Sequence, residues 1–238
     1  MRTPGTPVLL AASHGTNDRA GQDAVARLVG AVSAATPHTT VRGSFVDVQQ
    51  PGVAESLGVL DRDESVVIVP LLLSAGYHVR VDLAEAASRA AQGDVRVTGA
   101  LGPDERLTGV LAARLHEAGL RPTDNVVLAA AGSSDASAVA DCHRVSRQLA
   151  ALLERPVTVG FLSAAEPRLR DAVDAVRAAS PGRVVVASYL LAPGYFAGLA
   201  RSAGADVVSA PLLGEHGDPP TALVEIVIDL YRRSASGV

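Results

Sequence analysis

The sequence has no tryptophan, only 3% aromatic residues and one cysteine in 238 residues. A lone cysteine, Cys142, excludes an internal disulfide and the zinc sites that need two or four cysteines. It also favours a reducing compartment, so we expect a cytoplasmic protein. Aromatics are scarce although 48% of the residues are hydrophobic. The core must therefore be built from Ala, Val and Leu, which are typical of parallel sheets flanked by helices.

The sequence also lacks long apolar runs and a basic excess. The first apolar run, residues 8–12, is too short for a signal peptide, and no run reaches the length of a membrane span. The formal net charge of −4 leaves no basic surface for nucleic acid. We therefore expect neither a membrane nor a nucleic acid as a partner.

Short apolar runs alternate with longer amphipathic segments along the whole chain, which predicts parallel strands joined by helices. The expected strands cover residues 7–12, 39–46, 65–71, 94–100, 125–130, 156–162, 183–190 and 206–209. A closing helix is expected near residues 219–233, and turn residues between 118 and 124 predict a linker. The sequence thus predicts an α/β fold with two four-stranded parallel sheets.

The two halves of the chain also align with each other. Gly15 aligns with Gly132 at a spacing of 117 residues (132 − 15), and both follow an apolar strand pattern. Further landmarks keep almost the same spacing: Phe45 and Pro51 with Phe161 and Pro167, and Gly76-Tyr77 with Gly194-Tyr195. A repeat this long indicates a duplicated domain, because solenoid repeats are much shorter. We expect domains at residues 1–120 and 121–238, and a monomer, since an internal duplication can replace a symmetric dimer.

The two copies differ where the shared scaffold could carry chemistry. Each potential metal ligand of the first copy stands opposite a poor ligand in the second: His14 opposite Ala131, Asp47 opposite Ser163 and His78 opposite Phe196. All three lie at or beyond the carboxyl end of an expected strand, the edge where open parallel sheets bind ligands. With the common strand order 2-1-3-4, the three residues hang from adjacent strands and can converge on one ion.

Two imidazoles and a carboxylate suit borderline divalent ions such as iron, cobalt, nickel or zinc. Three protein ligands leave coordination positions open, whereas a structural zinc site is normally closed by four. An imidazole can also accept protons near neutral pH. The first copy therefore predicts a site that handles a metal, with His14 and His78 as catalytic residues and Asp47 as the third ligand.

Two motifs carry a resemblance to a known family, Ser13-His14-Gly15-Thr16 and the run from Val69 to Val79 that includes Leu72-Leu73-Ser74-Ala75-Gly76-Tyr77-His78. Here the chain resembles the sirohydrochlorin chelatases, class II chelatases of sirohaem and cobalamin synthesis, in their two-domain single-chain form. The resemblance implies two similar α/β domains that face each other across a cleft. It also implies that His14 and His78 bind the incoming metal and that Asp47, where the family usually has Glu, assists.

The resemblance further implies a lyase-type chelatase whose substrates are a tetrapyrrole and a divalent metal, with no permanently bound cofactor. We favour Fe²⁺ slightly over Co²⁺, and Ni²⁺ is a third option. The macrocycle would lie between the halves, near Tyr77 and Phe196, with Arg80 and Arg201 gripping its carboxylates. Asp82 matches an acidic residue of the family motif and has no assigned role.

Two other functions remain open. The chain could carry a metal or a tetrapyrrole without turnover, because fold and ligands alone do not prove catalysis. It could also be a metal-dependent hydrolase in which Asp82 would have to act as the general base. The Ser133-Ser134-Asp135 cluster does not support a hydrolase, since it lacks the nucleophile-elbow pattern and fits a helix cap.

Overall fold

The structure is a computed structural model that describes residues 5–74, 76–91 and 93–236, and only the backbone of residues 77–80. Two four-stranded sheets form the centres of two lobes, and all strand pairs are parallel. The strand orders are β2-β1-β3-β4 and β6-β5-β7-β8. Both orders confirm the predicted arrangement, which is the same in the two copies.

The elements of the first half alternate as the sequence predicted. In chain order they are β1 (Val8–Ser13), α1 (Arg19–Ala35), β2 (Val41–Phe45), α2 (Val53–Gly58), β3 (Val66–Pro70), α3 (Tyr77–Ser88), β4 (Val95–Val97) and α4 (Glu105–Glu117).

The second half repeats this series. Its elements are β5 (Asn125–Ala130), α5 (Ala136–Leu153), β6 (Val157–Phe161), α6 (Leu169–Ala179), β7 (Val184–Tyr189), α7 (Tyr195–Arg201), β8 (Val207–Val208) and α8 (Thr221–Ala235). None of the helices in the described part of the chain is long and apolar enough to cross a membrane.

The central strands are buried on both faces, which explains their continuous apolar sequences. Every residue of β1, β3 and β7 is buried. One face of the first sheet packs against α2 and α3 through residues such as Leu57 and Leu83. The opposite faces of both sheets share one core that includes Leu28, Leu111 and Ile226 from three helices of the two halves. The lobes are therefore joined by a common apolar interior.

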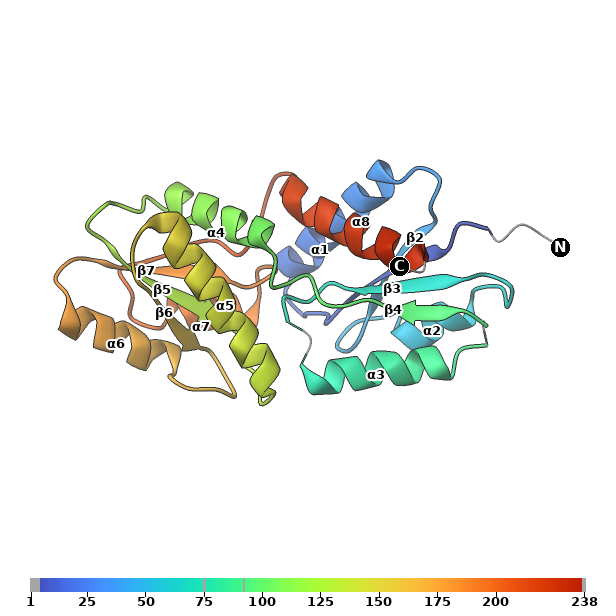
Figure 1. Cartoon of the computed structure of the whole chain (residues 1–238), viewed down its shortest axis with the longest axis horizontal. Coiled ribbons are helices and arrows are strands. Elements are labelled where there is room, and N and C mark those ends of the chain that lie inside the picture. Colours follow the sequence, from blue (N-terminus) through green and yellow to red (C-terminus); the bar gives the residue numbers. More distant parts are fainter. Residues whose placement is uncertain (1–4, 75, 92, 237–238) are drawn as a thin grey trace.

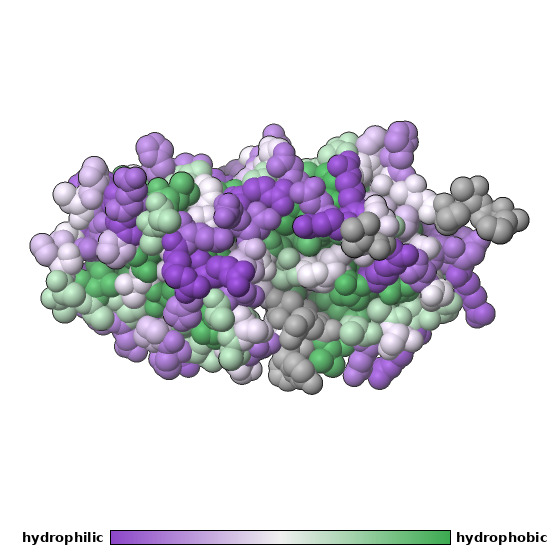
Figure 2. Space-filling view, in the orientation of Figure 1, coloured by the Kyte–Doolittle hydropathy of each residue, from purple (hydrophilic) through white to green (hydrophobic). Residues whose placement is uncertain are grey.

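The last helix of each half packs on the other lobe (Figure 1). Helix α4 lies against β7 and α5, whereas α8 lies against β3 and α1. The two exchanged helices also meet, and Arg106 of α4 forms an ion pair with Asp229 of α8 at 2.7 Å. Figure 2 shows hydrophilic surface where these helices meet. Residues 1–120 and 121–238 stay predicted as the two domains, but in space each sheet is covered by a helix of the other half.

Candidate functional site

His14 and Asp47 lie side by side at the carboxyl edge of the first sheet. The pairing of β1 with β2 continues past the strand ends, because the Val46 N–H donates to the Ser13 carbonyl (2.8 Å) and the Asp47 N–H donates to the His14 carbonyl (3.0 Å). Both side chains are exposed. A backbone hydrogen bond therefore joins the two predicted metal ligands, and both of their side chains are accessible.

A glycine turn makes this close approach possible. Gly15 has φ +93°, and a side chain there would overlap the Asp47 carbonyl oxygen. The second copy repeats the turn, since Gly132 has φ +90° and lies against the Ser163 carbonyl oxygen. Only glycine adopts this conformation at low cost and leaves room for the neighbouring strand. Gly15 and Gly132 thus align because both copies need glycine in this turn. The chemical difference between the copies comes from the residues next to the glycines.

Two glutamines hold the loop after His14, and the sequence analysis did not identify them. The Gln49 side-chain oxygen accepts from the Thr16 N–H at 2.9 Å, and the Gln22 side-chain nitrogen donates to the Thr16 carbonyl at 2.8 Å. In the second copy, Ala165 occupies the position that corresponds to Gln49. The sequence could have revealed Gln49, because a polar residue of the first copy stands opposite an alanine of the second, as His14 stands opposite Ala131.

The carboxylate of Asp47 is partly engaged by its own loop. Its Oδ1 accepts from the Val48 N–H at 2.7 Å, and Val48 has φ +62°, which is unfavourable for a β-branched residue. One carboxylate oxygen bonds to this turn, so Asp47 would offer a metal mainly its other oxygen.

His78 lies in the first turn of α3, after a loop that connects it to β3. The predicted ligand and the neighbouring candidates Tyr77 and Arg80 have side chains outside the described residues. Among the side chains that are described, no group of three His, Cys, Asp or Glu could hold a metal ion. The triad of His14, Asp47 and His78 therefore stays a prediction.

The second lobe places an aromatic pair beside the His14 loop. Gly194, which precedes α7, lies next to Thr16 and Asp18. Tyr195 and Phe196 follow directly, with ring centroids 5.7 Å apart and exposures of 75% and 36%. Most of the surface of Tyr195 is therefore exposed beside the His14 loop.

Arg201 is the last residue of α7 and is exposed. No ion pair joins its side chain to another residue of the described ranges. Its guanidinium lies at the opposite end of α7 from Phe196. Its role in substrate binding stays a prediction.

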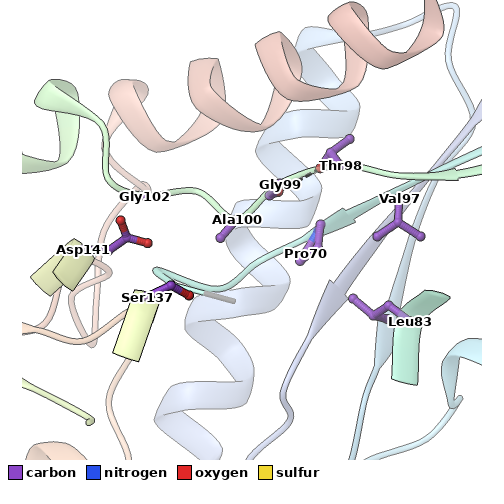
Figure 3. A pocket seen from close by; sticks show the side chains of 9 residues that line it. All are labelled: Pro70, Leu83, Val97, Thr98, Gly99, Ala100, Gly102, Ser137 and Asp141. Carbon is purple, nitrogen blue, oxygen red and sulfur yellow. Dashed lines mark hydrogen bonds between the residues drawn. The ribbon is translucent and has the colours of Figure 1, made fainter. Parts of the chain in front are cut away.

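A cavity of about 350 Å³ lies between the lobes (Figure 3). The first lobe contributes strand ends and one helix residue, and the second lobe contributes two polar residues of α5. The lining residues are Pro70, Leu83, Val97, Thr98, Gly99, Ala100, Gly102, Ser137 and Asp141. The cavity opens at the same carboxyl edge of β3 and β4 from which the loop to α3 departs, so it adjoins the predicted site.

Charged groups behind this edge are paired and fix the scaffold. Arg106 donates two hydrogen bonds to Asp104, which holds the pKa of that carboxyl below its usual range. Arg183 likewise pairs with the buried Asp124 at 2.7 Å and lowers its pKa. Asp135, from the serine-rich cluster, accepts from the Ser137 N–H and caps α5, which confirms the predicted helix cap. None of these groups is free to act as a metal ligand.

Comparison with known sequences gives two matches. The profile of the CbiX family matches residues 8–118 and 125–223. A curated sirohydrochlorin ferrochelatase from Priestia megaterium is 29% identical over 136 residues, which covers 54% of this chain and 51% of that protein. The match thus spans about half the length of the curated relative.

Solved structures share the whole fold. SirB from Bacillus subtilis with Fe³⁺ superposes with a TM-score of 0.78 at 21% identity, over 98% of this chain and 96% of that one. SirB from Bacillus subtilis subspecies spizizenii, in complex with cobalt, gives 0.74 at 19% identity over the same shares. CbiX, the terminal enzyme for siroheme biosynthesis in denitrifying bacteria, gives 0.64 at 19% identity over 93% of this chain and 98% of that one. These likenesses establish the two-lobed α/β fold.

Proposed function

We propose that this chain, which belongs to the CbiX family of sirohydrochlorin chelatases, inserts a divalent metal ion into sirohydrochlorin. The observation that carries the proposal is the backbone hydrogen bond that joins His14 and Asp47 at the carboxyl edge of the first sheet. The equivalent hydrogen bond of the second copy joins Ala131 to Ser163, whose side chains offer no strong metal ligand. The metal chemistry therefore belongs to the first copy.

Three residues would handle the metal. His14 and His78 bind it as neutral imidazoles, and Asp47 contributes its free oxygen directly or through water. Open coordination positions let the pyrrole nitrogens replace water on the ion. Insertion releases two protons from the macrocycle for each divalent ion, and each of the two imidazoles would accept one of them as it leaves the metal. The same side chains thus serve delivery and deprotonation.

The macrocycle would lie between the lobes. Phe196 and the exposed Tyr195 offer aromatic surface beside the His14 loop, and the macrocycle can stack on such surface. Tyr77 starts the matching helix of the first lobe. Arg80 and Arg201 would bind peripheral carboxylates, since a guanidinium can form two parallel hydrogen bonds to a carboxylate.

We propose Fe²⁺ as the metal, with Co²⁺ as the alternative. The support for iron is that the curated relative is named a ferrochelatase. Structures of SirB contain Fe³⁺ in one case and cobalt in another, which fits a ligand set that accepts both ions. Steady-state insertion rates compared across Fe²⁺, Co²⁺ and Ni²⁺ with one macrocycle would decide the order.

Replacement of each histidine by Ala tests the site. His14→Ala installs the residue that the second copy has at this position, Ala131, so the scaffold should tolerate it. We expect His14→Ala and His78→Ala to lower the insertion rate by at least about 100-fold, followed through the visible absorption of sirohydrochlorin. His38→Ala is the control, because His38 is exposed in the turn before β2, at the opposite edge of the sheet. Full activity of both site variants would refute the proposed site.

The experiment also separates the alternatives. A protein that only carries a metal or a tetrapyrrole would not convert more than one macrocycle per chain, so multiple turnovers exclude it. A metal-dependent hydrolase would need Asp82 as general base, and Asp82 is an exposed residue of α3. Retention of insertion activity by Asp82→Asn would remove that reading.

A further inference from the structure

Tyr189 of the second copy reaches across the lobe interface to the loop that leads to His78. It is the last residue of β7 and is only 3% exposed. Its hydroxyl donates to the carbonyl oxygen of Leu73 at 3.2 Å. Leu73 lies between the end of β3 and Gly76, the residue that caps α3. One buried hydroxyl of the second lobe thus bonds to the loop that leads to a predicted metal ligand of the first.

The same carbonyl is satisfied differently in the two copies. In the second copy the corresponding oxygen, that of Leu191, accepts from the backbone N–H of Leu213 at 2.8 Å. In the first copy the Leu73 oxygen accepts from the tyrosine side chain instead. The residue of the first copy that corresponds to Tyr189 is Leu71, at a spacing of 118 residues (189 − 71), and leucine cannot donate a hydrogen bond. The second copy therefore donates this hydrogen bond to the first copy, and the first copy has no equivalent donor for the second.

The surroundings preserve this hydrogen bond. A side chain at Gly102 would overlap the Tyr189 hydroxyl and would lie 2.6 Å from the Leu73 oxygen, so glycine leaves the room for it. Burial raises the pKa of Tyr189, so the hydroxyl stays protonated and remains a donor throughout the neutral range. The neighbouring carbonyl of Leu72 accepts from the Leu101 N–H at 2.8 Å. The loop is thus held at two consecutive carbonyls.

We infer that Tyr189 is a positioning residue that fixes the loop before α3, and through it His78, in the orientation that metal insertion needs. This inference rests on the proposed function for its catalytic consequence, whereas the anchoring itself does not. Hydrogen bonds that orient a metal-binding side chain typically change metal affinity or activity by about 10- to 100-fold when they are removed. The second lobe therefore contributes to the metal site without providing a ligand.

The chain offers a closely matched control for this inference. Tyr231 of α8 is also buried, at 4% exposure, and its hydroxyl donates to a backbone carbonyl of the first half, that of Pro7, at 2.6 Å. Pro7 precedes β1, so this contact lies at the amino edge of the sheet, opposite to the predicted site. Tyr189→Phe and Tyr231→Phe therefore remove the same group from two buried residues at opposite ends of one sheet.

The test compares the two variants in the full chain. We expect both to lower the urea midpoint of unfolding by similar amounts. Only Tyr189→Phe should weaken Co²⁺ binding by about tenfold, change the visible absorption band of bound Co²⁺ and lower kcat more than it raises KM for the macrocycle. Amide hydrogen exchange in the peptide that contains Leu73 should be faster in Tyr189→Phe and unchanged in Tyr231→Phe.

Each outcome has one meaning. Equal effects of the two variants on Co²⁺ binding and kcat would overturn the inference, even if the wild-type protein inserts metal. If the wild-type protein does not insert metal, the proposed function fails, and the Co²⁺ spectrum and hydrogen exchange still decide whether Tyr189 positions the loop. Unchanged exchange at Leu73 in Tyr189→Phe would refute the anchoring directly.

Discussion

The paired turns at Gly15 and Gly132 allow stability and metal chemistry to be separated. Substitution of Gly15 by Ala forces a side chain into φ +93° and against the Asp47 carbonyl oxygen. The left-handed conformation costs about 1–2 kcal/mol in a residue with a Cβ atom, and overpacking adds about 1–3 kcal/mol. The total of roughly 2–5 kcal/mol is large but below the stability of many domains, which is about 5–15 kcal/mol.

Gly15→Ala must also displace the Asp47 strand end by about 1 Å to reach a normal contact distance. Because His14 and Asp47 flank the turn, a shift of this size should lower the metal insertion rate by about 100-fold. Gly132→Ala creates the same backbone strain in the second copy and an even closer overlap, with the Ser163 carbonyl oxygen. It should destabilise the protein at least as much but leave kcat of the folded fraction nearly unchanged.

The assay combines urea unfolding with insertion rates measured at a temperature where both variants are folded. Two results would refute the reasoning. Equal loss of kcat in Gly15→Ala and Gly132→Ala would show that the chemistry is not confined to the first copy. A stability change below about 0.5 kcal/mol in either variant would show that the turn does not need glycine.

Three further predictions follow from single side chains. Asp124→Asn should destabilise the protein by about 1.5–3 kcal/mol at pH 7, because the charged hydrogen bonds from Arg183 are lost. The pKa of Asp124 is lowered in the folded state. Its contribution to the free energy of unfolding is therefore present above the ordinary carboxyl pKa of about 3.9 and is lost as the pH falls through the pKa of the folded state. The difference in urea midpoint between variant and wild type should shrink over the same pH range. Burial raises the pKa of Cys142 to about 11, so iodoacetamide at pH 8 should label the unfolded chain much faster than the native one. Asp47→Ser, which copies the second lobe, should leave stability within about 1 kcal/mol and weaken Co²⁺ binding by about tenfold in a titration.

Much of the fold was predictable because its signals are local. Strand β5 matches the expected residues 125–130 at both ends, and the buried strands β1 and β3 differ from expectation by about one residue. Continuous apolar runs mark such strands clearly. The short edge strands β4 and β8 are less well predicted, since β4 covers Val95–Val97 where residues 94–100 were expected. Edge strands bury less surface, so their apolar patterns are weaker.

The exchange of α4 and α8 between the lobes was not predictable from local patterns. An amphipathic helix has an apolar face, but that face does not specify which sheet it covers. The same limit applies to Tyr189 and Gln49, whose hydrogen bonds join residues far apart in the chain. Alignment of the two halves could have identified both residues as candidates, because each is polar where the other copy has an apolar or small residue.

The exchanged helices explain how one copy can lose its ligands without losing its place in the fold. Helix α8 of the second half covers β3, whose carboxyl end starts the loop to His78, and α4 of the first half covers β7, which ends in Tyr189. In each sheet a helix of the other half completes the cover of one face, so the second copy remains necessary for packing even where Ala131 and Ser163 offer no strong ligand. Selection on the scaffold is then separate from selection on the ligands. The residues of the second copy that still influence the metal should be those that contact the loops of the first, and Tyr189 beside Leu73 and Gly194 beside Thr16 meet that criterion.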